Sequence, residues 1–472
     1  MTLSIPFDNS YARLPASLFT RQSPQPVTAP ELLAFNRALA ADLGITEGDN
    51  AEMGRVFGGN AVPAGADPLA QLYAGHQFGN WNPQLGDGRA VLLGEVVAGG
   101  NRYDIQLKGS GRTPYSRGGD GRAWLGPVLR EFVVSEAMHA LGVPTTRALA
   151  AVATGDTIWR DDGPLPGAVL TRVAASHIRV GTFQVLAARG MTAELQALYD
   201  HVVDRHYPDV TSPAGLLDAV IARQAELIPH WMSVGFIHGV MNTDNTAISG
   251  ETIDYGPCAF MDEYHPNTVF SSIDRQGRYA FSNQPDIIVW NMAQLATALV
   301  PLMPDADDAV KEFTAAIHGM GPMLQANWLR RFAAKIGIAA PKSEDLELVT
   351  SLLTLMAHGQ SDFTNTFRAL SGKAAVDQFT DRDAFRAWET RWRKRLETED
   401  DPVRVMDAAN PAFIPRNHRI EEMIAAAQTG DMMPFERLMN VLSRPYDDQP
   451  ENADLTRPPT ENERVMATFC GT

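Results

Sequence analysis

Two neighbouring segments in the middle of the chain carry oxygen ligands at a spacing that could hold a metal ion. Residues 238–245 read His-Gly-Val-Met-Asn-Thr-Asp-Asn, and residues 253–256 read Ile-Asp-Tyr-Gly. The amide oxygen of Asn245 and the carboxylate of Asp254 are hard ligands of the kind that Mg²⁺ prefers, with phosphate oxygens and waters completing an octahedron. A single polar loop before a turn is more often structural, so its meaning depends on the residues upstream.

A lysine and a glutamate upstream lie on elements that could support such a site. Apolar and β-branched residues alternate over 90–97 and again over 102–108, with a glycine turn between them, which predicts a β-hairpin ending in Lys108. A stripe of apolar residues at helical spacing over 124–141 carries Glu131. A lysine on a strand can neutralise phosphate charge, and a helix glutamate can hold its ammonium in place.

The order of these elements is that of the small lobe of protein kinases. A loop with Gly86, Gly88 and Arg89 comes first, then the hairpin and the helix. Glycines in such a loop let backbone N–H groups approach phosphates. Each element is a common feature when it occurs alone, but their order, followed by the two metal-binding segments, favours a nucleotide and metal site.

One position departs from the kinase pattern and bears on the reaction type. The catalytic aspartate of a kinase lies five residues before the metal-binding asparagine, and here that residue is Val240. The nearest carboxylate is Asp244, beside Asn245, where it could accept a hydroxyl proton from a different direction. The usual base for phosphoryl transfer is therefore missing.

Further blocks of uncommon sequence lie between residues 73 and 264. They include Tyr73-Ala-Gly-His-Gln-Phe-Gly79, Gln106-Leu-Lys-Gly-Ser-Gly-Arg-Thr-Pro-Tyr-Ser-Arg117, Asp120-Gly-Arg122, Pro144-Thr-Thr-Arg147 and Met241-Asn-Thr-Asp-Asn-Thr246. Through these blocks the chain resembles the selenoprotein O family of kinase-like protein adenylyltransferases. The resemblance implies that ATP binds in a flipped orientation and that AMP is transferred to Ser, Thr or Tyr hydroxyls of proteins, with UMP transfer as an extension.

The resemblance also implies roles for individual residues. Asn245 and Asp254 would hold Mg²⁺, for which Mn²⁺ could substitute, Asp244 would accept the proton, and Glu131 would anchor Lys108. Arg172 and Arg179 are seven apart, so they could face one phosphate together if their segment is helical. The residues implied to hold the nucleotide are Gly86, Gly88, Arg89, Lys108, Asp120, Gly121, Arg172 and Arg179.

Two alternatives stay open: ordinary phosphoryl transfer by a kinase, and a non-catalytic, nucleotide-binding pseudokinase. Val240 argues against the first, and the intact set of metal ligands argues against the second. Redox control is a further hypothesis, because some members of the family carry selenocysteine near the C-terminus, where this chain has Cys470. A bridge between Cys258 and Cys470 could tie the tail beside the metal site, although two unrelated reduced thiols remain the alternative.

The bulk composition limits the partners. The 472 residues carry a formal net charge of -16, which disfavours binding to nucleic acid or anionic membranes. No apolar run approaches the length of about 18 residues that a membrane span needs, and the first ten residues lack a secretory pattern. We therefore expect a cytoplasmic enzyme, with a monomer favoured, that acts on protein substrates.

These patterns together predict an α+β fold, specifically a protein-kinase-like two-lobed structure with a small β-rich lobe and a large helical lobe. A helix around residues 30–43 and a long helix from Pro213 towards Met232 are among the expected elements. The expected divisions are an N-terminal extension (1–82), the small lobe (83–165), the helical lobe with the metal site (166–450) and a C-terminal tail carrying Cys470 (451–472).

Overall fold

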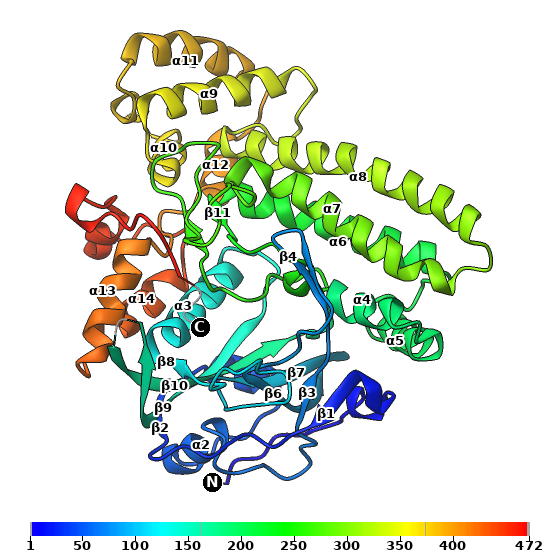
Figure 1. The fold of residues 1–472 in the computed structure, drawn as a ribbon. Helices are drawn as coiled ribbons and strands as arrows, with labels where there is room; N and C mark the ends of the chain where they lie inside the picture. The colour runs from blue at the N-terminus through cyan, green and yellow to red at the C-terminus, as the bar shows by residue number, and fades with distance from the viewer. Residues whose placement is uncertain (1, 162, 373, 470–472) are drawn as a thin grey trace.

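The computed structural model describes residues 2–161, 163–372 and 374–469. It is a mixed fold in which an antiparallel sheet lies at one end and a large group of helices at the other (Figure 1). The α+β class expected from the sequence is therefore confirmed. Within the described residues, no helix is long and apolar enough to cross a membrane.

The main sheet has eight strands, all paired antiparallel. Its order is β1-β3-β6-β7-β10-β9-β2, with β8 paired to β10. The strands are β1 (Phe19–Arg21), β2 (Glu31–Phe35), β3 (Leu69–Gln71), β6 (Ala90–Ala98), β7 (Asn101–Lys108), β8 (Ala123–Trp124), β9 (Arg147–Arg160) and β10 (Gly163–Ala174). The predicted hairpin is confirmed as β6 and β7. Along β7, Ile105 and Leu107 face a buried apolar cluster, which leaves Lys108 on the opposite face.

The predicted helix with Glu131 is α3 (Leu125–Ala140), which packs on β9 and β10. Its apolar side chains, such as Leu129 and Val133, are fully buried. Two late helices, α13 (Asn417–Gln428) and α14 (Met433–Leu442), cover α3, and the rings of Phe132 and Phe435 lie 5.5 Å apart (Figure 1). Helix α3 is thus held between the sheet and the C-terminal helices.

Most of the other helices lie away from this end of the sheet and form the helical part of the molecule (Figure 1). They are α4 (Val180–Ala188), α5 (Thr192–His206), α6 (Pro213–Ser233), α7 (Gln284–Leu299), α8 (Ala306–Lys335), α9 (Asp345–Gly359), α10 (Phe363–Ala369), α11 (Arg382–Leu396) and α12 (Pro402–Ala409). Helix α6 begins as predicted, because the hydroxyl of Ser212 accepts the N–H of Gly215 at 3.1 Å. It packs against α7 and α8.

The helix expected over residues 30–43 is wrong in its first half. Residues Glu31–Phe35 form β2, because Leu32 and Ala34 pair with β9 and so complete the sheet edge. A short helix, α1 (Arg37–Asp42), follows, and the side chain of Asn36 caps it by accepting the N–H of Leu39. Another short helix is α2 (Asn50–Phe57). Sheet pairing overrode the local helical pattern here.

The sheet does not follow the expected divisions of the chain. Residues 1–82 contribute β1, β2 and β3 to the same sheet as residues 83–165. The boundary expected after residue 165 falls inside β10, whose second half pairs with β7. Three strands from the first 82 residues therefore belong to the sheet that carries Lys108.

Candidate functional site

A cavity of about 420 Å³ brings most of the predicted site residues together. The predicted residues that line it are Gly86, Gly88, Arg89, Lys108, Asp120, Gly121, Arg172, Arg179, Asp244, Asn245 and Asp254. Glu131 lines a smaller adjoining pocket together with Lys108, Asn245 and Asp254. Residues almost 170 positions apart in the sequence thus face one space.

Two cations and two carboxylates alternate at the base of this cavity. Lys108 Nζ lies 2.6 Å from Glu131 Oε2 and also contacts Asp254 Oδ1. Arg172 Nη2 lies 2.6 Å from Glu131 Oε1 and 2.8 Å from Asp254 Oδ1. Burial alone would raise the pKa of both carboxyls, but Lys108 and Arg172 outweigh it and lower both pKa values, that of Asp254 well below its usual range. Both groups are therefore anionic at neutral pH.

The strand register explains how Lys108 and Arg172 meet. Strands β7 and β10 pair with Leu170 opposite Lys108 and Arg172 opposite Gln106. Residues two apart on a strand share a face, so Arg172 is a diagonal neighbour of Lys108 on the cavity side. Their carboxylate partners come from α3 and from the loop at residue 254.

The helical arrangement considered for Arg172 and Arg179 is wrong. Arg172 belongs to β10, and Arg179 is the residue before α4. The two guanidinium groups still reach one carboxylate, because the chain turns between the strand and the helix. Arg172 is 2.8 Å from Asp254 Oδ1, and Arg179 Nη1 is 3.9 Å from Asp254 Oδ2.

The oxygen atoms of Asn245 and Asp254 fit a hard divalent cation. Asn245 donates its Nδ2–H to the carbonyl of Val240 at 3.0 Å, which leaves the amide oxygen for a ligand. Asp254 has a φ of 70°, in the left-handed region, and its Oδ2 lies 3.9 Å from Arg179 Nη1. In the described part of the chain no group of three or more His, Cys, Asp or Glu side chains could hold a metal. An ion here would need phosphate oxygens and waters as its other ligands, as Mg²⁺ commonly does.

Asp244 lies in a short 3₁₀ turn, Thr243–Asn245, and is almost completely buried. Its Oδ2 accepts a hydrogen bond from Gln77 Nε2 at 3.1 Å, whereas its Oδ1 has no hydrogen-bond partner among the described residues. Burial raises the pKa of Asp244 to about 6. A Cβ on Gly75 would lie 2.7 Å from Oδ1, so glycine is required at this close approach. Asp244 is thus a buried carboxylate in the cavity lining, and one of its oxygens has no hydrogen-bond partner among the described residues.

The hairpin of β4 (Gly75–Gln77) and β5 (Asn80–Asn82) supports this turn. The N–H of His76 donates to Thr243 Oγ1 at 2.7 Å, and the N–H of Phe78 donates to Asn242 Oδ1 at 3.1 Å. The first of the sequence blocks quoted above therefore packs directly on the turn that carries Asp244.

Sequence reasoning did not assign several residues that line the cavity, among them Asp87, Tyr73 and Arg160. Asp87 is buried between Gly86 and Gly88, and burial raises its pKa to about 6. The ring of Tyr73 lies 4.4 Å from the guanidinium carbon of Arg179. Arg160 Nη1 lies 2.8 Å from Asp120 Oδ2. Tyr73 begins a sequence block quoted above, and Asp87 lies between two glycines named there. Nothing in the sequence, by contrast, pairs Arg160 with Asp120, which lies 40 positions earlier.

The redox hypothesis concerns residues that the structure describes only in part. Cys258 is buried, and burial raises the pKa of its thiol to about 12. The tail is tied beside it, because Thr468 Oγ1 donates to the carbonyl of Pro257 at 2.6 Å. Cys470 lies outside the described residues, so the bridge to Cys258 stays a prediction.

Comparison with known proteins decides the family. The family model described as "Protein adenylyltransferase SelO" matches residues 1–443. The chain belongs to the SelO family. The resemblance inferred from the motifs between residues 73 and 264 is thereby confirmed, and the chain is by class a protein nucleotidyltransferase.

Its relatives within the family match over the whole length. A protein nucleotidyltransferase YdiU from Ruegeria pomeroyi is 67% identical, with 100% of both chains covered. The protein of that name from Roseobacter denitrificans is 63% identical, again over 100% of each chain. One from Rhizobium meliloti is 57% identical, with 99% of each covered. The similarity to these relatives therefore covers 99% or more of each chain.

Proposed function

We propose that this chain transfers AMP from ATP to the hydroxyl groups of Ser, Thr or Tyr side chains in proteins, and that it can also use UTP to transfer UMP. The observation that carries the proposal is the Asp244 carboxylate, which lines the cavity and has one oxygen without a hydrogen-bond partner among the described residues, while position 240 is a valine. Such a group accepts the proton of an attacking hydroxyl.

The cations of the cavity would hold the triphosphate. Lys108, Arg172 and Arg179 supply positive charge in a chain whose net charge is -16. Gly86 and Gly88 would allow backbone N–H groups to approach phosphate oxygens. Arg89, Asp120 and Gly121, which line the same cavity, would complete the nucleotide site.

Asn245 and Asp254 would hold Mg²⁺, or Mn²⁺ in its place, through the amide oxygen and Oδ2. A bound ion would offset the negative charge of the phosphates and of the pyrophosphate leaving group. Glu131 would keep Lys108 and Arg172 in place, since it contacts both at 2.6 Å. The acceptor oxygen forms a bond to the α-phosphorus, the bond from that phosphorus to pyrophosphate breaks, and the hydroxyl proton passes to Asp244.

This proposal includes a kinase-like arrangement of two lobes, with the sheet and α3 as the small lobe and the helices from α4 onwards as the large lobe. The ion pair between Lys108 on a strand and Glu131 on a helix supports it. We further propose that the chain acts as a cytoplasmic monomer on protein substrates.

The test is to incubate the protein with Mg²⁺ and ATP labelled at the α or the γ position, and to follow label into protein. Label from the α position alone is expected. Label from the γ position alone would indicate a kinase, and bound ATP without either label would indicate a pseudokinase. Asp254→Ala, treated identically, should transfer no label and so controls for contaminating enzymes.

A further inference from the structure

A buried charge network lies behind the nucleotide cavity, and the proposed chemistry does not use it. At its centre is Arg205 of α5. Its Nη1 lies 2.6 Å from Glu95 Oε1, and its Nη2 lies 2.6 Å from Asp104 Oδ1. Its Nε donates to the carbonyl of Ala175 at 2.8 Å. The side chains of Arg205, Glu95 and Asp104 are at most 3% exposed, so the network is closed to solvent.

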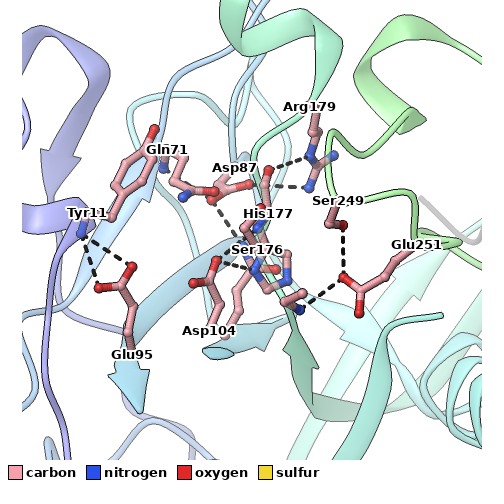
Figure 2. Close-up of polar contacts among 12 residues, drawn as sticks. Tyr11, Gln71, Asp87, Glu95, Asp104, Ser176, His177, Arg179, Ser249 and Glu251 are labelled. Atoms are coloured by element: carbon pink, nitrogen blue, oxygen red, sulfur yellow. Dashed lines mark hydrogen bonds and ion pairs between the residues drawn. The ribbon is translucent and has the colours of Figure 1, made fainter. Parts of the chain in front are cut away.

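Asp104 connects this arginine to the loop between β10 and α4. Its second oxygen, Oδ2, accepts the backbone N–H of His177 at 2.8 Å and lies 2.9 Å from His177 Nδ1 (Figure 2). Burial lowers the pKa of His177 to about 4, so the ring is neutral at pH 7 and donates from Nδ1. Arg205 therefore binds the loop at Ala175, and Asp104 binds it at His177.

Arg179 stands at the other end of the same short loop. Its Nε donates to the carbonyl of His177 at 3.3 Å, and its Nη1 donates to the carbonyl of Asp244 at 2.8 Å. Figure 2 shows it directed towards Asp87, whose Oδ1 lies 3.9 Å from Arg179 Nη2. The direction of its guanidinium therefore depends on where residues 175–178 are held.

We propose that Arg205 and Asp104 are positioning residues that hold the 175–179 loop so that Arg179 faces the triphosphate. The inference rests on the proposed nucleotide site. Because Arg205 binds two carboxylates on two strands and a loop carbonyl at once, it fixes the loop to β6 and β7. A lysine, with one compact ammonium, cannot span all three acceptors.

The same network reaches the N-terminal segment. Glu95 accepts the N–H of Tyr11 at 3.1 Å (Figure 2) and the hydroxyl of Ser10 at 3.0 Å. Residues near the start of the chain thus support the carboxylate that orients Arg205.

The test is a double-mutant cycle on the affinity for ATP, measured by calorimetry, with Arg205→Met and Arg179→Met made singly and together. Each single change is expected to raise the Kd about tenfold. If Arg205 acts through Arg179, the double variant should bind about as weakly as Arg179→Met alone. Arg205→Lys should recover part of the affinity. If Arg205→Met does not fold, Asp104→Asn, which keeps the side-chain shape, takes its place in the cycle.

Arg395→Met is the matched control, because Arg395 also binds two carboxylates, Asp345 at 2.7 Å and Glu399 at 2.9 Å, between α9 and α11. Alone, Arg395→Met should lower stability and leave the Kd for ATP unchanged. Combined with Arg179→Met, it should leave the Kd at the value of Arg179→Met alone. Two results would overturn this inference but not the proposed function. They are additive losses of ATP affinity in Arg205→Met and Arg179→Met, and an Arg205→Met protein with native affinity. Failure of the native protein to bind ATP would overturn the proposed function as well.

Discussion

Lys335, the last residue of α8, is an ammonium group inside the helical part of the protein. It is 2% exposed, and its Nζ lies 4.4 Å from the ring centre of Phe367 and 5.3 Å from that of Phe363. Within the described residues no carboxylate lies at ion-pair distance from it. We predict that replacing it with methionine, which keeps an unbranched stem, stabilises the protein.

The size of the effect follows from the pKa. Burial lowers the pKa of Lys335 from 10.5 to about 7. Since one pH unit corresponds to about 1.4 kcal/mol, the buried ammonium destabilises the folded state by about 4 kcal/mol at pH 7. Attraction to the two rings offsets about 1 to 2 kcal/mol. Lys335→Met should therefore raise the free energy of unfolding at pH 7 by about 2 to 3 kcal/mol.

The sign of the pH dependence gives a second check. Between pH 7 and pH 10 the unfolded chain retains a proton that the folded chain has lost, so raising the pH stabilises the native protein relative to the variant. The advantage of Lys335→Met should therefore shrink to less than about 1 kcal/mol at pH 10.

The assay is urea unfolding at pH 7 and pH 10, with Lys311→Met as the control on the same helix. Lys311 is 76% exposed, so its replacement should change stability by less than about 0.5 kcal/mol at either pH. No gain at pH 7 for Lys335→Met, or the same gain at both pH values, would refute the reasoning.

Three further predictions concern the cavity. Asp244→Asn keeps the shape of the side chain and should leave the Kd for ATP within about twofold while slowing AMP transfer by about 10²- to 10⁴-fold; an unchanged rate in the α-label assay would exclude Asp244 as the proton acceptor. Asp254→Asn removes a charge that contacts Lys108 and would face the proposed metal ion, so Mn²⁺ titrated by paramagnetic resonance should bind at least about tenfold more weakly, and native Mn²⁺ affinity would contradict the metal site. Gly86→Ala should raise the Kd for ATP about tenfold, because Gly86 has a φ of 118° and a Cβ there would lie 2.6 Å from Tyr115 Cγ. Gly319→Ala, with no atom within 4 Å of the new Cβ, should leave the Kd unchanged, and equal effects of the two alanines would contradict the steric argument.

Much of the site could be predicted because its elements have strong local signals. The alternation along β6 and β7 placed Lys108 on the face away from the apolar cluster, and the stripe along α3 identified the helix of Glu131. The loop before Asn245 was recognisable from residue types alone. Each of these inferences needed only residues within one element and its neighbours.

The edges of the sheet could not be predicted in the same way. Residues Glu31–Phe35 carry a pattern compatible with a helix, and only their pairing with β9 makes them a strand. Arg172 and Arg179 could have faced one phosphate along a helix if their segment were helical, whereas a strand and the residue before α4 bring them together. In both places a long-range pairing outweighed the local preference.

The sequence by itself supplied the groups available for chemistry: two candidate metal ligands, cations that could hold a triphosphate, a valine at position 240 in place of the kinase base, and the motifs that indicated the family. The tertiary structure decided which charged groups form ion pairs. Lys108 and Asp254 are 146 positions apart, and Arg205 and Glu95 are 110 apart, yet each pair is in contact. Contacts of this kind arise because an opposite charge offsets the cost of burying a charge, and which partner is within reach depends on how the strands and helices pack.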